Sequence, residues 1–406
     1  KGHGMTAAEI LFWVLAGVIA YAYLGYGALV VALSRRKGPP AGGGDRESPD
    51  LYEPAATLLV SAYNEESWLA RKIGNSQSLD YPEEKLGIVV VTDGSNDGSA
   101  EILRKFPRVR HLHAPVRRGK MAAINRAMEC VDTEIVIFSD ANAMLNREAV
   151  REIVRYFRDP AVGCVSGEKR ISTEGAGGAA DSGEGTYWRY ESRIKEAEAR
   201  LGSCVGAAGE LFAIRAGLFR EEAEDTILDD FTISMRIALR GYRVRYAPAA
   251  FAVETASAGI GEEFKRKIRI AAGNLQAVLR MPELLNPFRQ GMLAFQYVSH
   301  KFLRSFAVPL CFAALIPLNL LLLRKGGVLY PSLLALQGIF YLAAGAGCLL
   351  RNRRLSSRLF FVPFYVVVMN LSALAGVSRY AAGRQSVLWE KALRKEPSAV
   401  GEDGGP

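Results

Sequence analysis

Acidic and amide residues recur at short spacing in two segments of this 406-residue chain. Asp93 stands in VVVTDGSNDGS, and Asp140 and Asn142 stand in FSDANA. Oxygen ligands this close together suit Mg²⁺ or Mn²⁺ ions that bridge phosphates. A purely local role is the alternative, because Asp and Asn also cap turns and helices. Each segment taken alone leaves both readings open.

Two adjacent carboxylates, Asp229 and Asp230, occur in ILDDFTISMRIAL. One of them can cap the helix that this apolar pattern predicts, since a helix N-terminus favours negative charge. Two neighbouring acids are not both needed for one cap. A carboxylate aimed into a pocket is also what a base for an alcohol nucleophile requires.

A basic cluster follows at Lys265, Arg266, Lys267 and Arg269. Contacts with anionic lipid headgroups would explain it. The guanidinium fork of arginine equally suits a clamp on a leaving pyrophosphate.

Three short apolar runs must position these side chains. ATLLVSAY, LGIVVVTDG and EIVIFSDA each end in polar residues, and helix-like segments follow the first two. This alternation predicts parallel strands with crossover helices, and ligands bind beyond the carboxyl ends of such strands. We therefore expect the strand ends to converge on one site, with Asn64, Glu65, Asp93, Asp140 and Asn142 around it.

Composition favours a membrane protein over a nucleic-acid binder. The chain has 51 Lys and Arg against 42 Asp and Glu, a formal charge of +9, but half of its residues are hydrophobic and these concentrate near the two ends. The five cysteines have no metal-ligand spacing, and only four histidines are present. Neither a disulfide framework nor a zinc site is indicated.

Four stretches free of charge are long enough to cross a bilayer. The predicted order is a lead at 1–9, a first span at 10–34, a linker at 35–54, an α/β domain at 55–260 and interfacial amphipathic helices at 261–305. Further spans at 306–323, 328–350 and 359–378, and a tail at 379–406, complete the chain.

Basic residues beside the spans set the expected orientation. Three follow the first span and four lie between the third and fourth spans, which predicts that the central domain is cytosolic. Strict alternation of four spans places the tail outside, and we expect it there, with Trp389. Five basic residues in the tail favour the opposite side.

Together these motifs resemble the membrane-integrated family 2 glycosyltransferases, which include cellulose, chitin, hyaluronan and poly-N-acetylglucosamine synthases and the oligosaccharide synthase of nodulation. The resemblance covers Ala55 to about Leu279 and the flanking spans. It rests on the order of VSAYNEE, VVVTDGSNDGS, RRGKMAAINRAM, FSDANA, GAAGELFAIR, LDDF and KRKIR.

This resemblance implies a GT-A fold, a mostly parallel sheet between helices, and roles for individual residues. The nucleotide of a UDP-sugar would contact Tyr63, Asn64, Glu65, Asp93 and Lys120. The metal-binding DxD motif matches Asp140 to Asn142, with Asn in place of the second Asp, and would hold Mg²⁺ or Mn²⁺. The TED motif matches Leu228 to Asp230, with Asp230 as the catalytic base beside Asp229.

The acceptor side follows in the same way. The acceptor turn matches Val205 to Glu210 and includes Gly206 and Gly209. The QxxRW motif matches Arg266 to Ile270, with Arg266 and Arg269 near the leaving group and Ile270 in place of Trp. An aromatic platform promotes processive synthesis, so we expect short products or a single transfer unless Trp188 or Tyr187 supplies the ring.

The implied reaction is inverting transfer of a sugar to an acceptor hydroxyl at the inner cell membrane, by a multi-pass enzyme with a cytosolic catalytic domain. The acceptor would be a growing poly- or oligosaccharide, or a membrane lipid that receives a single sugar. A non-catalytic scaffold is the remaining alternative, and it would require these acidic residues to have been lost. Membrane lipids are expected partners, and nucleic acid is not.

Overall fold

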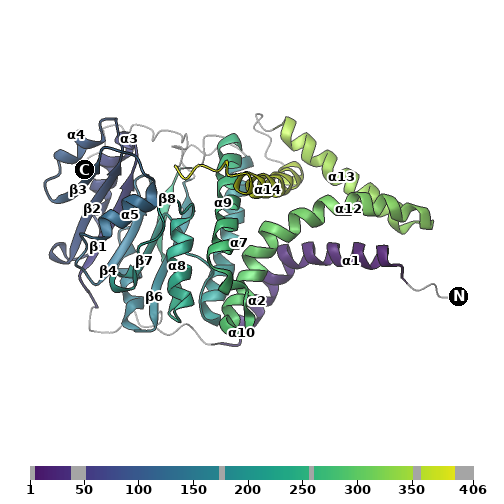
Figure 1. Cartoon of the computed structure of the whole chain (residues 1–406), viewed down its shortest axis with the longest axis horizontal. Helices are drawn as coiled ribbons and strands as arrows, with labels where there is room; N and C mark the ends of the chain where they lie inside the picture. Colours follow the sequence, from purple (N-terminus) through teal and green to yellow (C-terminus); the bar gives the residue numbers. More distant parts are fainter. Residues whose placement is uncertain (1–4, 38–51, 173–178, 256–259, 351–357, 389–406) are drawn as a thin grey trace, which may run out of the picture.

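A computed structural model of the chain describes residues 5–37, 52–172, 179–255, 260–350 and 358–388. Most of the predicted linker and most of the predicted tail, including Trp389, lie outside these residues. Figure 1 shows two parts, an α/β domain built on one sheet and a group of long helices beside it.

One eight-stranded sheet forms the centre of the α/β domain, in the order β3-β2-β1-β4-β7-β6-β8-β5. The first four strands in this order run parallel. β7 is antiparallel to β4 and β6, whereas β8 is parallel to β6 and antiparallel to β5. The predicted mostly parallel sheet is confirmed. The strands are β1 (Ala56–Ala62), β2 (Leu86–Asp93), β3 (Val109–Ala114), β4 (Ile135–Asp140), β5 (Met144–Leu145), β6 (Val162–Ile171), β7 (Leu211–Arg215) and β8 (Arg243–Glu254).

The apolar runs form the central strands because both faces of the sheet are covered. Successive side chains of a strand point to opposite faces. Leu58 and Val60 therefore pack into one core, and Leu59 and Val91 pack into the other. Full burial of each such side chain contributes about 1.5–3 kcal/mol, which fixes the register that brings the strand ends together.

Helices pack on both faces of this sheet (Figure 1). α3, α4 and α6 contribute to the first core, and α5 and α8 contribute to the second. The helices of the domain are α3 (Glu66–Gln77), η2 (Glu83–Lys85), α4 (Ser99–Arg104), α5 (Lys120–Met128), α6 (Ala149–Val154), η3 (Arg155–Arg158), α7 (Ala179–Leu201), η4 (Ala216–Leu218) and α8 (Asp229–Leu239).

Within the described residues, four continuous helices are long and apolar enough to cross a membrane. The first joins α1 (Ala7–Ala20), η1 (Tyr21–Gly25) and α2 (Tyr26–Ser34). The second joins α11 (Met292–Tyr297), η6 (Val298–Ala307), α12 (Val308–Leu322) and η7 (Leu323–Lys325). The third is α13 (Leu329–Leu349), and the fourth is formed by α14 (Arg358–Ala381).

The second of these helices starts earlier than the span predicted at 306–323. Its helical backbone begins at Met292, within the region predicted to be interfacial. Lys301 and Arg304 interrupt this segment, which hides its continuity from a search for charge-free runs, and its first turns also contain the polar residues Gln296, Ser299 and His300. These side chains are buried because this end of the helix packs against the α/β domain.

α9 (Ile260–Arg280) connects the domain to the membrane helices. Short helices η5 (Pro282–Leu285) and α10 (Pro287–Gln290) follow it. Both begin with proline, whose fixed φ suits the first position of a helix. The prolines thus break the chain into separate segments ahead of Met292.

α14 packs closely along α9. In Figure 1 α14 is seen nearly end-on, while α12 and α13 run across the view. A Cβ atom on Gly376 of α14 would lie 2.4 Å from the Ile268 carbonyl oxygen and 2.6 Å from the Ala271 Cβ atom. The glycine lets the two helix backbones approach, so α14 supports the helix that carries the basic cluster.

We predict that Gly376→Leu lowers the thermal unfolding temperature of the detergent-solubilised protein. The larger side chain must separate α14 from α9, and overpacking of this kind costs about 1–3 kcal/mol. Gly338→Leu in α13 is the matched control, because a Cβ atom there meets no heavy atom within 4 Å. Equal unfolding temperatures for the two variants would contradict the proposed close packing.

Candidate active site

A cavity of about 1340 Å³ lies beyond the carboxyl ends of β1 and β4 and extends to the membrane helices. The structure brings most of the predicted site residues to its wall. Asn64 and Asp93 are described but do not line it. The predicted residues that do are Tyr63, Glu65, Lys120, Asp140, Asn142, Trp188, Gly206, Gly209, Glu210, Asp229, Asp230, Arg266, Arg269 and Ile270.

Lys120 joins the two halves of the site. It is the first residue of α5, and its Nζ lies 2.9 Å from Asp140 Oδ1 and 3.0 Å from Asp229 Oδ2. Burial alone would lower the pKa of Lys120, but these two carboxylates raise it above its ordinary value. The ammonium group therefore stays charged and holds the end of β4 beside the start of α8.

The Asp140 to Asn142 turn is held from beneath by Lys72 of α3. The Lys72 side chain is fully buried, and its Nζ donates to Ser139 Oγ at 2.8 Å and to the Ala143 carbonyl oxygen. Burial lowers the pKa of Lys72 to about 7. Lys72 is a positioning residue that the sequence analysis missed, since LARKIGNS reads as an ordinary amphipathic helix.

Asp229 and Asp230 are the first two residues of α8, but Leu228 is the N-cap residue and no side chain caps the helix, so the helix-cap alternative is not what the structure shows. Asp230 Oδ1 accepts the Phe231 backbone N–H at 2.8 Å. Burial and the neighbouring Asp229 raise the pKa of Asp230 to about 7, against the opposing effect of Lys120. Such a carboxylate can take up a proton near neutral pH, which suits a general base.

Gly209 lies against the Asp230 carboxylate. A Cβ atom at this position would be 3.1 Å from Asp230 Oδ2. Gly206 in the same turn has φ of 83°, a conformation that favours glycine. The turn therefore passes close to Asp230 and leaves one side of the carboxylate open to the cavity.

Asp93 and Asn64 hold loops in the described conformation. Asp93 is fully buried, and its carboxylate accepts the backbone N–H groups of Arg118 and Gly119, the latter at 2.7 Å. Asn64 exchanges two hydrogen bonds with Asn96, at 2.8 and 2.9 Å. The Asn64 bonds connect the loops that follow β1 and β2. The Asp93 bonds fix the backbone at Gly119, the residue directly before Lys120.

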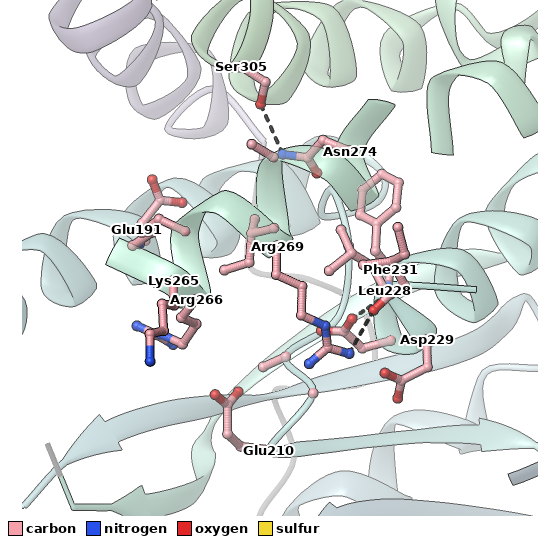
Figure 2. A pocket seen from close by; sticks show the side chains of 18 of the residues that line it. Glu191, Glu210, Leu228, Asp229, Phe231, Lys265, Arg266, Arg269, Asn274 and Ser305 are labelled. Atoms are coloured by element: carbon pink, nitrogen blue, oxygen red, sulfur yellow. Dashed lines mark hydrogen bonds between the residues drawn. The ribbon is translucent and has the colours of Figure 1, made fainter. Parts of the chain in front are cut away.

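The two arginines of α9 point in different directions, as Figure 2 shows. Arg269 reaches toward Asp229, and its guanidinium donates to the Ile227 carbonyl oxygen at 3.1 Å. Arg266 lies on the side remote from Asp229 and pairs with Glu263 through two hydrogen bonds of 2.9 Å. Arg269 is therefore the arginine positioned beside the carboxylates.

Glu210 belongs to a buried ion cluster with Lys169 and Glu254. Lys169 Nζ bonds both carboxylates and lies 5.3 Å from the centre of the Trp188 ring. The cluster fixes Glu210 and Trp188 at the cavity wall. Sequence analysis missed Lys169 and Glu254, although a charge inside an apolar strand is a signal that could have found them. The side chain of Tyr187 lies outside the described residues.

The segment after α14 corrects the expected position of the tail. Arg384, Gln385, Ser386 and Leu388 line the same cavity as Asp230, and a Cβ atom on Gly119 would lie 3.6 Å from Val387. The prediction that the tail begins on the side opposite the catalytic carboxylates is wrong. It assumed that α14 crosses the bilayer, whereas its end returns to the α/β domain.

Comparison with protein families identifies this domain. Residues 57–221 match the model described as glycosyl transferase family 2. This range contains β1, β4 and the start of α5, with Tyr63, Lys120 and Asp140. The chain contains a glycosyl transferase family 2 domain.

Two similar proteins from staphylococci agree with this assignment. The poly-β-1,6-N-acetyl-D-glucosamine synthase of Staphylococcus aureus (strain COL) is 27% identical over 236 residues, and that of Staphylococcus epidermidis is 26% identical over 234 residues. Each match covers 55% of this chain and 55% of the relative. The chain thus spans about half the length of the curated relatives it matches.

A solved structure shares the fold. The mannosyltransferase PcManGT from Pyrobaculum calidifontis, in complex with GDP-Man and Mn²⁺, superposes with a TM-score of 0.68 at 23% identity. The match covers 92% of this chain and all of that one. The glycosyltransferase domain has the GT-A fold, and apolar helices accompany it, as predicted.

We predict that a cysteine at Ser386 is labelled from the same membrane face as the glycosyltransferase domain. Ser386→Cys should react with an impermeant maleimide together with Ser78→Cys, an exposed position at the end of α3. Val328→Cys, between α12 and α13, marks the opposite face and is 79% exposed. Labelling of Ser386→Cys together with Val328→Cys would place the tail across the membrane. The unsubstituted protein gives the background from its own five cysteines.

Proposed function

We propose that this protein transfers a sugar from a UDP-sugar to an acceptor hydroxyl, with inversion at the anomeric carbon, and thereby builds a poly- or oligosaccharide. The observation that carries the proposal is the placement of Asp230. Its carboxylate has a pKa of about 7 and faces a cavity that it shares with Lys120, Asp140 and Arg269. A base and a cationic site for a diphosphate thus line one space.

The chemistry follows from this geometry. The acceptor oxygen forms a bond to the anomeric carbon while the bond from that carbon to the diphosphate oxygen breaks. Asp230 takes the acceptor proton, and UDP leaves with the bonding electron pair. Lys120 and Arg269 stabilise the negative charge that develops on the diphosphate. No covalent intermediate on the enzyme is required.

Donor binding would use the loops after β1 and β2. Tyr63 lines the cavity, and the Arg117 guanidinium carbon lies 3.6 Å from the centre of its ring. Glu65 lines the cavity. Asn64 and Asp93 would act mainly by holding these loops, with direct nucleotide contact still a prediction for both.

A divalent ion would be held by Asp140 and Asn142. No group of three or more His, Cys, Asp or Glu side chains among the described residues could hold a metal alone. The pair nevertheless fits Mg²⁺ or Mn²⁺, because such ions take one or two protein ligands together with substrate phosphates. When bound, the ion would neutralise diphosphate charge beside Lys120.

Acceptor binding would use the turn at Gly206, Gly209 and Glu210, with Trp188 and Ile270 on the walls. The staphylococcal relatives are named as synthases of poly-β-1,6-N-acetyl-D-glucosamine, which supports a saccharide product. Trp188 lines the cavity and offers a ring face that Ile270 lacks. We propose Trp188 as the platform for the terminal sugar of a short chain.

The enzyme would sit in the inner cell membrane with its catalytic domain in the cytosol. This arrangement would have three crossings, by α1 with α2, by α11 with α12, and by α13, with α14 in the cytosolic interface. It would put the basic segments at 35–37 and 351–358 and the tail on one side, and only Arg324 and Lys325 on the other. This topology removes the conflict between charge and span count.

Asp230→Asn should abolish sugar transfer while UDP affinity stays close to that of the unsubstituted protein. The amide keeps the shape of the side chain but cannot accept the acceptor proton. Product formation and UDP calorimetry measure the two effects separately. If UDP affinity disappears together with activity, Asp230 is a nucleotide ligand and the proposed role fails.

The rate of transfer should rise with pH through a midpoint near 7, because the base acts only when Asp230 is deprotonated. Asp229→Asn removes the neighbouring negative charge that helps to raise this pKa. Its rate profile should therefore shift to lower pH. An unchanged midpoint in that variant would show that another group controls the profile.

Asp140→Ala should remove the dependence of activity on divalent ions and most UDP binding, because Asp140 is the charged member of its pair. Asn142→Asp adds a second carboxylate and should tighten Mn²⁺ binding, measured by calorimetry in the presence of UDP. Full activity of the unsubstituted enzyme in excess chelator would rule out the metal role.

A further inference from the structure

The cavity does not end at the carboxylates but continues between the membrane helices. On this side its wall contains Tyr23 and Leu24 of the first helix. Apolar side chains of α14, among them Val362, Val366 and Met369, form the facing wall. An apolar group that enters from the bilayer would contact apolar side chains on both walls.

A buried ion cluster lies between this apolar part and the catalytic carboxylates. Each ring nitrogen of His300 is 2.8 Å from a carboxylate, Glu191 on one side and Glu198 on the other. Tyr26 donates to Glu198 at 2.5 Å, and Arg304 pairs with Glu191. Both carboxylates are thus fully engaged by partners within the protein.

Two lysines in the same region are left without such partners. Lys195 of α7 and Lys301 of η6 both line the cavity. Lys195 is only 8% exposed to solvent. Neither ammonium group makes a hydrogen bond or ion pair with any residue that the structure describes. An ammonium group removed from water is costly unless an anion accompanies it.

Lys195 and Asp230 line the same cavity. The charges of both act on the buried Cys164 thiol, whose pKa burial raises. In Figure 2, Glu191 and the Asn274–Ser305 pair lie on one side of α9, and Glu210 and Asp229 lie on the other. The cavity passes from one side to the other along this helix.

We propose that the acceptor is carried on a lipid phosphate, and that Lys195 and Lys301 bind this phosphate. The inference rests on the proposed transfer to an acceptor hydroxyl and specifies the acceptor class. The hydroxyl of the headgroup lies at Asp230, the phosphate lies between the two lysines, and the hydrocarbon tail leaves between the first membrane helix and α14. A neutral saccharide chain would offer neither ammonium group a negatively charged hydrogen-bond acceptor.

Binding to the full chain in dodecyl maltoside micelles tests this assignment by calorimetry. The probes are farnesyl phosphate, farnesol, which has the same tail without the phosphate, and inorganic phosphate. We expect farnesyl phosphate to bind at least tenfold more tightly than farnesol or inorganic phosphate. Charged hydrogen bonds of this kind correspond to about tenfold to hundredfold in affinity.

Variants locate the phosphate. Lys195→Met and Lys301→Met should each weaken farnesyl phosphate binding about tenfold or more and leave UDP affinity unchanged, whereas Lys195→Arg should retain binding. Lys105→Met at the end of α4 is the matched control, since Lys105 is an exposed lysine of the same domain. Unfolding temperatures verify that each variant is folded.

Several results would overturn the proposal. Equal binding of farnesol and farnesyl phosphate would show that the phosphate is not recognised. Inorganic phosphate that binds as tightly as farnesyl phosphate would make the source a free anion and not a lipid. Unchanged binding in both Met variants would remove the lysines from the site. If the unsubstituted protein neither binds UDP nor transfers a sugar, the proposed function itself fails. UDP binding and lipid binding are measured in separate titrations, so the two failures can be distinguished.

Discussion

The ion bridge of Lys120 to Asp140 and Asp229 is the contact on which the site depends. It joins the end of a parallel strand to the start of a helix that follows much later in the chain. A lysine between a buried carboxylate, Asp229, and a half-buried one, Asp140, offsets their mutual repulsion. This positive charge opposes the rise that burial causes in the pKa of Asp140 and of Asp230. The bridge also leaves a cation where a diphosphate would bind.

α9 packs against the membrane helices on one side and against the residues next to this bridge on the other. On one side, a Cβ atom at Gly273 would lie 2.4 Å from Leu228, directly before Asp229. On the other side, Gly376 lets α14 reach the backbone of the same helix. Arg269 extends from α9 toward the carboxylates (Figure 2). A membrane-side helix is thus in contact, through α9, with the residues proposed to carry out chemistry.

Buried charge in this protein divides into two kinds. The Lys169 cluster and the His300 cluster are satisfied internally, and they fix Glu210, Trp188 and the start of the second membrane helix. Asp230 and the lysines at 195 and 301 face open cavity. Groups of the first kind specify the structure, while groups of the second kind remain available to a substrate.

The sequence by itself determined the parallel strands, the acidic strand ends and the family of the domain. These follow from local pattern, since the spacing of apolar residues and the residue types of a motif can be recognised within a few consecutive residues. Most of the site residues that it identified line the cavity, because Asp140, Asp230 and Arg269 stand in short motifs. It could not find Lys72, Lys169 or Glu254, whose roles arise from contacts between elements distant in the chain.

Only the tertiary structure decided the place of α14 and of the segment directly after it. Hydropathy counts α14 as a span, because length and apolar content are the same for a helix that crosses a bilayer and for one that packs along α9. The assembled chain packs α14 against α9 at Gly376 and places Arg384 and Ser386, beyond the end of α14, at the wall of the cavity. Likewise, the membrane-side cavity, with two lysines that pair with no residue in the described part of the chain, exists only once α7, η6 and α14 are assembled, since no single segment contains its walls.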